Sequence, residues 1–135
     1  MSKYNNYEQI LYEWICQFVD KDKYEQPLAY RNTAPTLEEI QDFGEKVYCV
    51  YTVFQGGFGQ QTSQPITLYC YGSQRKLFEK IQLLSQELLN GATVVSGNNI
   101  KVKFTSGSPF IQDKADANEN IKGYYVNIIA TVYKV

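Results

Sequence analysis

Histidine is absent from this chain of 135 residues, and tryptophan and methionine occur once each. Without histidine there is no Ser-His-Asp or Cys-His arrangement, no histidine general base and none of the usual zinc sites. The three cysteines, Cys16, Cys49 and Cys70, have no regular spacing and fall within apolar patterns, as free buried thiols do. A GxxxxGK[ST] phosphate-binding loop is also missing. The residues therefore predict a non-enzymatic protein with no catalytic residues, metal site or cofactor.

Two segments resemble ligand-binding loops only in part. Asp116, Asn118 and Asn120 have the spacing of a calcium loop, but the sixth position is Ile121 instead of glycine, and the twelfth is not glutamate. Residues 56–59, Gly-Gly-Phe-Gly, follow a predicted strand and do not open a helix, as a nucleotide-binding loop would. We expect both segments to be solvated loops, and carboxylate chemistry remains as the enzymatic alternative.

Charge and hydropathy exclude further classes. The formal net charge is -1, so bulk electrostatics do not point to nucleic acid. Lys101 and Lys103 form a small basic strip, and Arg75, Lys76 and Lys80 form another; solvated faces are expected, with an acidic protein neighbour or passing nucleic acid as the alternative. No apolar run is long enough to cross a membrane, and no secretion signal opens the chain, so we expect a reduced, cytosolic protein.

Apolar periodicity predicts two amphipathic helices. One spans residues 7–19, and the other begins after the N-cap Ser73 and stops at Gly91. The core side of the second helix is predicted to comprise Leu77, Phe78, Ile81, Leu84, Leu88 and Leu89. Thr36 and Glu39 have capping-box spacing, which favours a short helix up to Phe43. An extended surface segment is the alternative there.

Strand patterns cover residues 47–54, 66–71, 100–105 and 121–135, with short strands at 28–31 and 93–95. A turn is predicted at 105–110 and a charged loop at 113–120. The last strand is apolar on both faces, which is typical of a central strand. We therefore predict a single α+β domain over residues 1–135, with a mainly antiparallel sheet of four or slightly more strands and two amphipathic helices on one face.

The other sheet face also carries tyrosine, valine and isoleucine, so we expect something besides the two helices to cover it. The chain has 12 tyrosines, which favour either strands or interfaces. Residues 55–65 are too long for a tight hairpin turn and hold three glycines around Phe58. This connection is either a mobile hairpin tip or an arm that orders on a partner. The predicted interface residues are Gln55, Gly56, Gly57, Phe58, Gly59, Gln60, Gln61, Tyr125, Tyr133 and Val135.

Four segments in this order resemble a known family. The first is a helix around Leu-Tyr-Glu-Trp at 11–14, and the second is a glycine-bearing loop at 54–61. The third is an apolar strand at 66–71 that leads into a Ser-capped helix. The fourth is a Gly-Ser-Pro-Phe-Ile-Gln turn at 107–112, followed by an acidic loop and Ile-Lys-Gly-Tyr-Tyr-Val-Asn-Ile at 121–128. In this pattern the chain resembles the tail terminator, or tail completion, proteins of long-tailed bacteriophages, which are sometimes labelled minor capsid proteins.

The resemblance implies a tail-terminator-like fold and a structural virion protein. Such proteins form a ring, usually of six copies, on the head-proximal end of the tail tube, where they stop polymerisation and offer the head-joining surface. Expected partners are other copies, the tail tube protein and a head-side neck or connector protein, without a membrane or specific nucleic acid, although DNA passes through the ring lumen. The expected location is the neck region of the virion tail, and the host cytoplasm during assembly.

Besides the enzymatic alternative, three alternatives to a terminator remain open. A neck or head-completion protein and the cap of a phage-derived contractile particle are structural roles of the same kind. A soluble binding module that works as a monomer or dimer belongs to a different class.

Overall fold

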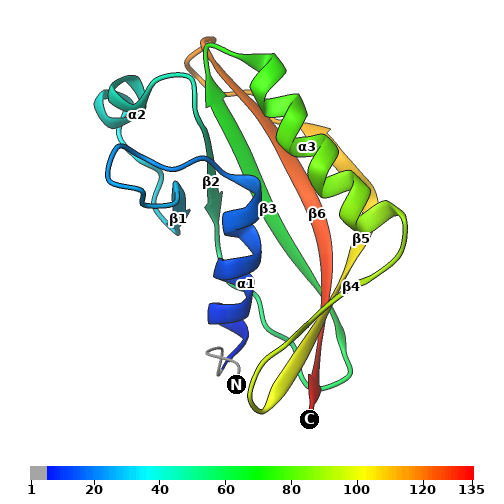
Figure 1. Cartoon of the computed structure of the whole chain (residues 1–135). Coiled ribbons are helices and arrows are strands. Elements are labelled where there is room, and N and C mark those ends of the chain that lie inside the picture. Colours follow the sequence, from blue (N-terminus) through cyan, green and yellow to red (C-terminus); the bar gives the residue numbers. More distant parts are fainter. Residues whose placement is uncertain (1–5) are drawn as a thin grey trace.

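The computed structural model describes residues 6–135. Its elements are α1 (Tyr7–Ile15), the 3-10 helix η1 (Cys16–Phe18), β1 (Ala29–Arg31), α2 (Leu37–Phe43), β2 (Val47–Tyr51), β3 (Gln61–Tyr71), α3 (Gln74–Leu89), β4 (Thr93–Ser96), β5 (Ile100–Asp113) and β6 (Ile121–Lys134). Figure 1 shows α1 and α3 lying together on one side of the sheet. The α+β class and the placement of two amphipathic helices on one face are confirmed.

The helices begin where side chains satisfy free backbone donors. The Asn6 carboxamide accepts a hydrogen bond from the Gln9 N–H, and the Ser73 hydroxyl accepts one from the Lys76 N–H. Thr36 and Glu39 form the predicted capping box, which confirms α2. The first helix is shorter than predicted, because α1 ends at Ile15 and tightens into η1 before Val19.

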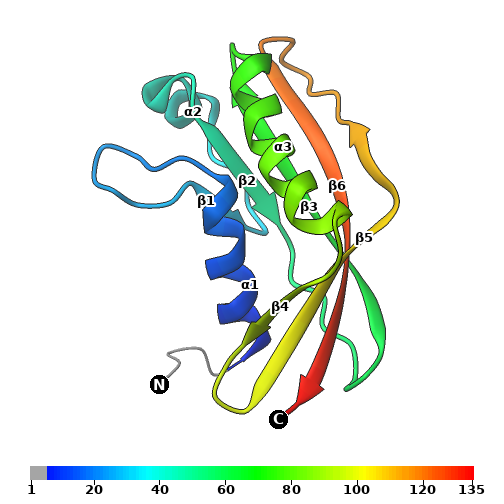
Figure 2. The ribbon, with the colours of Figure 1, turned by 45° about the vertical axis from the view of Figure 1, so that its right-hand side comes forward.

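The sheet has six strands in the order β1-β2-β3-β6-β5-β4, so the prediction of about four strands is wrong in number. β1 pairs with β2 in parallel, and the other pairs are antiparallel. β6 lies between β3 and β5, which confirms its central position (Figure 2). An apolar strand at the centre can bury both faces and bond to neighbours along both edges.

Two strands are longer than their local sequence predicts, and one is shorter. Gln61 to Pro65, predicted as loop, begin β3, and the predicted turn at 105–110 lies within β5. β3 extends because β6 is long enough to pair with all of it. Pro65 fits into the strand because it lies one position beyond the last β2–β3 pair, where a missing N–H donor is tolerated. A register shift between Ser106 and Ile111 takes the glycine and proline of this segment out of regular pairing. β2 ends at Tyr51 instead of continuing to residue 54.

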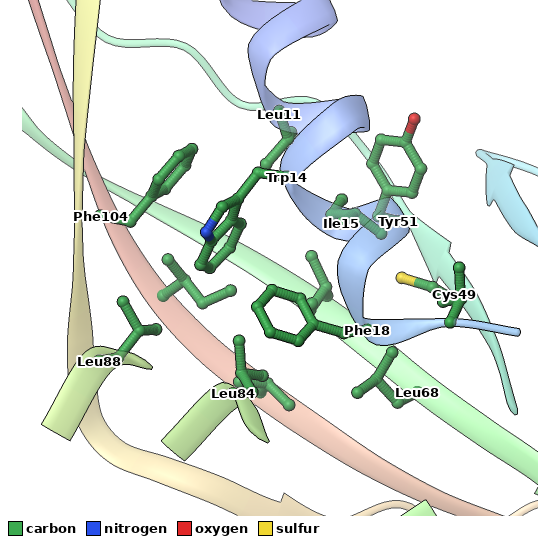
Figure 3. Close-up of a cluster of buried hydrophobic side chains, with 14 of the residues drawn as sticks. Leu11, Trp14, Ile15, Phe18, Cys49, Tyr51, Leu68, Leu84, Leu88 and Phe104 are labelled. Atoms are coloured by element: carbon green, nitrogen blue, oxygen red, sulfur yellow. The ribbon is translucent and has the colours of Figure 1, made fainter. Parts of the chain in front are cut away.

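The main core lies between the sheet and the pair α1 and α3 (Figure 3). The Trp14 indole stacks on the Phe104 ring with 4.1 Å between centroids, and Phe18 meets Trp14 edge to face. From α3, the buried side chains are Leu77, Ile81, Leu84 and Leu88. Phe78 and Leu89 were predicted to be core residues, but they are 46% and 60% exposed because they lie on the flank and the last turn of the helix.

A smaller cluster lies on the opposite face. There α2 packs Ile40 and Phe43 against Tyr48, with 5.5 Å between the Phe43 and Tyr48 ring centroids. Since Cys49 is in the main core, its neighbour Tyr48 points to the other side of β2. α2 therefore covers one corner of the second face of the sheet.

Candidate interaction surfaces

The connection between β2 and β3, residues 52–60, forms what we call the tip loop. Its base is held by Gln64, a fully buried polar side chain of β3. The Gln64 Oε1 atom accepts hydrogen bonds from the Phe54 N–H at 2.8 Å and the Tyr7 hydroxyl at 2.9 Å, while Nε2 donates to the Thr52 carbonyl at 2.7 Å. The Gln64 amide therefore bonds to the backbone just where β2 stops pairing with β3. Nothing in the local sequence around Gln64 predicts this role.

The far end of the tip loop is also fixed. The Gly59 N–H donates to the Val132 carbonyl of β6 at 2.8 Å, and Gly59 has a φ of +77°, which favours glycine. A Cβ atom added to Gly56 would lie 2.0 Å from the Thr62 hydroxyl oxygen, so the loop approaches β3 too closely for a side chain there. Between these attachments Phe58 is 61% exposed. The docking of this loop onto a partner stays a prediction, with a simple hairpin tip as the alternative.

The Gly59–Val132 bond brings most of the predicted interface residues together. The tip loop lies beside the end of β6, where Tyr133 is half-buried and Val135 is 74% exposed. The Lys101 ammonium lies 5.7 Å from the centroid of the Tyr133 ring, within cation–π range. We call the surface formed by the tip loop, Lys101, Tyr133 and Val135 the loop end.

Two predicted residues are placed differently. Gln61 is the first residue of β3 and not part of the loop. Tyr125 is on the same side of β6 as Tyr133, but eight residues away, which is about 26 Å along a strand. Tyr125 therefore belongs to a second surface.

That second surface is the uncovered part of the sheet, which we call the open face. Register places Thr67, Tyr125, Ile129 and Thr105 on it, and all four are only half-buried. Figures 1 and 2 show α1 and α3 on the other side of the sheet, and within residues 6–135 only α2 contributes a helix to the open side. Tyrosine, threonine and isoleucine on a pleated surface offer a broad, mixed apolar and polar contact area.

Tyrosines are packed at the corner of the open face. The Tyr48 and Tyr69 rings stack with 5.3 Å between centroids, and the Tyr69 ring lies so close to Gly123 that an added Cβ would be 2.8 Å away. Burial and the nearby Asp116 carboxylate raise the pKa values of both tyrosines above the usual value. These phenols stay neutral at physiological pH and serve as packing groups.

The cysteines are packing groups as well. Burial is the main cause that raises the pKa values of Cys16, Cys49 and Cys70 above the usual value for a thiol. All three are therefore protonated near neutral pH, the form that is a poor nucleophile.

The loop end and the open face can do what exposed apolar surface does, which is to pack against another protein. Over residues 6–135 there is no group of three or more acidic or cysteine side chains arranged to hold a metal ion. Within the same part of the chain, no helix is both long and apolar enough to span a bilayer. Compared with protein-family models, curated protein sequences and solved structures, the chain matches none.

Proposed function

We propose that this chain is a non-enzymatic structural protein of a phage virion, which caps the head-proximal end of the tail tube as a ring of six copies. In this role it ends tube polymerisation and provides the surface to which the head joins. The observation that carries the proposal is the loop end, where Phe58 projects from a loop that is anchored at both its base and its tip. An apolar ring held outward on a fixed support is suited to a protein partner.

The two surfaces support the ring itself. A ring needs a heterologous contact, in which two different patches of the same chain meet. The loop end and Tyr125 on the open face lie about 26 Å apart along β6, so one surface can face the tube or the neck while others face neighbouring copies. The proposed partners are other copies, the tail tube protein and a head-side neck or connector protein, with DNA crossing the lumen without base recognition.

Loss of the chain from its particle tests the proposal. Tails assembled without it should grow to uncontrolled length and fail to join heads, and adding the intact chain should restore both properties. Normal tail lengths and normal head joining without the chain would overturn the proposal.

Imaging of the purified particle separates the structural alternatives. A six-fold ring at the junction of tail and head is the expected result. A ring inside the head opening would favour a neck or head-completion protein, and a cap joined to a sheath would favour a contractile particle. A chain that never associates with particles, and stays a monomer or dimer, would favour a soluble binding module.

A further inference from the structure

A cleft beside the first half of α3 concentrates positive charge. Its volume is ≈ 330 Å³, and its lining residues are Asp20, Lys21, Lys46, Lys76, Glu79 and Lys80. Four lysines thus meet two carboxylates there, in a chain whose formal net charge is -1. We call this site the lysine cleft.

The ammonium groups are held in place by the fold. Lys46 donates to the Lys21 carbonyl at 2.9 Å, Lys76 donates to the Glu45 carbonyl at 3.0 Å, and Lys80 pairs with Asp20 at 3.4 Å. An ammonium has three N–H donors, so Lys46 and Lys76 keep donors for another acceptor. The lysine cleft is therefore preorganised to receive carboxylates.

The opposite charge gathers on the loop between β5 and β6. Asp113 at the end of β5 and Asp116 and Glu119 in the loop are exposed, together with Lys114. We call residues 113–119 the acidic loop. It lines a separate cavity of ≈ 400 Å³, whose lining also includes Gln74, Tyr124 and a second lysine, Lys122. The Lys122 ammonium donates to the Glu119 backbone carbonyl at 2.9 Å, and the three carboxylates outnumber the two lysines there.

The two charged sites lie on opposite flanks of α3. Residues of an α-helix are about 100° apart around its axis, so Lys76, Glu79 and Lys80 lie roughly 140–240° from Gln74, which lines the cavity of the acidic loop. Figure 2 shows the orange acidic loop on one side of α3 and the blue segment between α1 and β1 on the other. Each copy therefore presents one basic and one acidic side.

We infer that the acidic loop of one copy docks into the lysine cleft of the next copy. The inference rests on the proposed function, because it supplies the heterologous contact by which copies join into a ring. Complementary charge on opposite flanks lets every copy accept one neighbour and donate to another. The occupant of the lysine cleft is thus a second copy of this chain.

Charge reversal tests the contact, with sedimentation velocity at low and high salt as the readout. Wild-type chains should associate at low salt and separate as salt rises, because exposed ion pairs are screened. Lys21→Glu/Lys76→Glu and Asp113→Lys/Glu119→Lys should each weaken association by roughly tenfold or more, since like charges then face each other. An equimolar mixture of the two variants should associate again, because each contact regains opposite charges.

Lys23→Glu/Arg75→Glu, which makes the same change of charge at two exposed sites outside the lysine cleft, the acidic loop and the loop end, is the matched control and should associate like the wild type. A wild type that stays monomeric at low salt, variants that associate normally, or a mixture that stays dissociated would each overturn the inference. Circular dichroism establishes that each variant is folded. If one is not, the neutral pair Lys21→Gln and Asp113→Asn should still weaken association, and no weakening by either would contradict the docking.

Measurement of tail length distinguishes a failure of the docking contact from a failure of the proposed function. If the charge-reversed chains still set normal tail length, the docking contact is wrong but the proposed function stands. If the wild-type chain has no effect on tail length, the proposed function fails, whatever the association measurements show.

Discussion

The two faces of the sheet come from the same strands but have different neighbours. Along β6, Ile128 and Ala130 are buried beneath α1 and α3, whereas Ile129, between them, is half-buried on the open face. The residue types do not explain this difference, since isoleucine occurs on both faces. The difference in burial comes from the helices, which cover one face of the sheet. The apolar area on the other face is available to another protein.

The largest effect is expected on the helix-covered face. Phe104→Ala removes the ring that stacks on Trp14 in the core and should lower the free energy of unfolding by about 3–5 kcal/mol. Ile129→Thr on the open face should change it by less than about 0.5 kcal/mol, because the site is half-buried and threonine suits a strand. Urea unfolding measures both. Equal losses would mean that the open face is packed like the core.

A second prediction concerns the base of the tip loop. Gln64→Leu leaves the buried Tyr7 hydroxyl without its acceptor and releases the Thr52 and Phe54 backbone groups, at a cost of roughly 2–4 kcal/mol. Gln60→Leu is the matched control, since the Gln60 side chain accepts a hydrogen bond from the exposed Gly57 N–H, and it should cost less than about 0.5 kcal/mol.

Adding Tyr7→Phe to Gln64→Leu should recover part of the loss, because the unpaired hydroxyl is then absent. No recovery in urea unfolding would show that Gln64 does not act through Tyr7.

The third prediction is a loss of stability in alkali. Burial raises the pKa of Tyr7 above its usual value of 10.0, so the unfolded chain loses this proton first. Stability is full below pH 10 and falls as pH rises from there toward the folded-state pKa, by about 1.4 kcal/mol per pH unit for this group. Unfolding by urea at a series of pH values measures the slope. Tyr7→Phe should make the slope shallower by that amount, and an unchanged slope would contradict the assignment.

Hydrophobic periodicity and capping patterns predicted the elements whose signals lie within one segment of the chain. The stripes of α1 and α3, the capping box at Thr36 and the central place of β6 all follow from patterns within one segment. The polar start of β3 and the Gly-Pro stretch of β5 were predicted as loops, because pairing with the long β6 overrides their local preference.

The sequence likewise predicted the local features of the candidate surfaces, but not the long-range bonds that hold them. The glycine loop and the apolar end of the chain stand out in sequence, but the bond that joins Gly59 to Val132 links residues far apart in the chain. Gln64 lies in a polar run without any local pattern, and only the fold places it between Tyr7 and the tip loop.

The smallest effect on stability is expected at Phe58. Phe58→Ser should leave the melting temperature nearly unchanged and impair assembly onto tails, because the ring is exposed in the free chain. Phe78→Ser removes another exposed ring, on the flank of α3, and should leave assembly intact. A large drop in melting temperature for Phe58→Ser would make this residue part of the core.

Hydroxyl-radical footprinting of the free chain and of the assembled particle tests the central claim most directly, namely that the open face and the tip loop are covered only by assembly. Phe58, Tyr125 and Ile129 should be labelled in the free chain and protected in the particle, while Phe104 should be protected in both. Labelling that is the same in the two states, or protection of Phe58 and Ile129 already in the free monomer, would contradict the account.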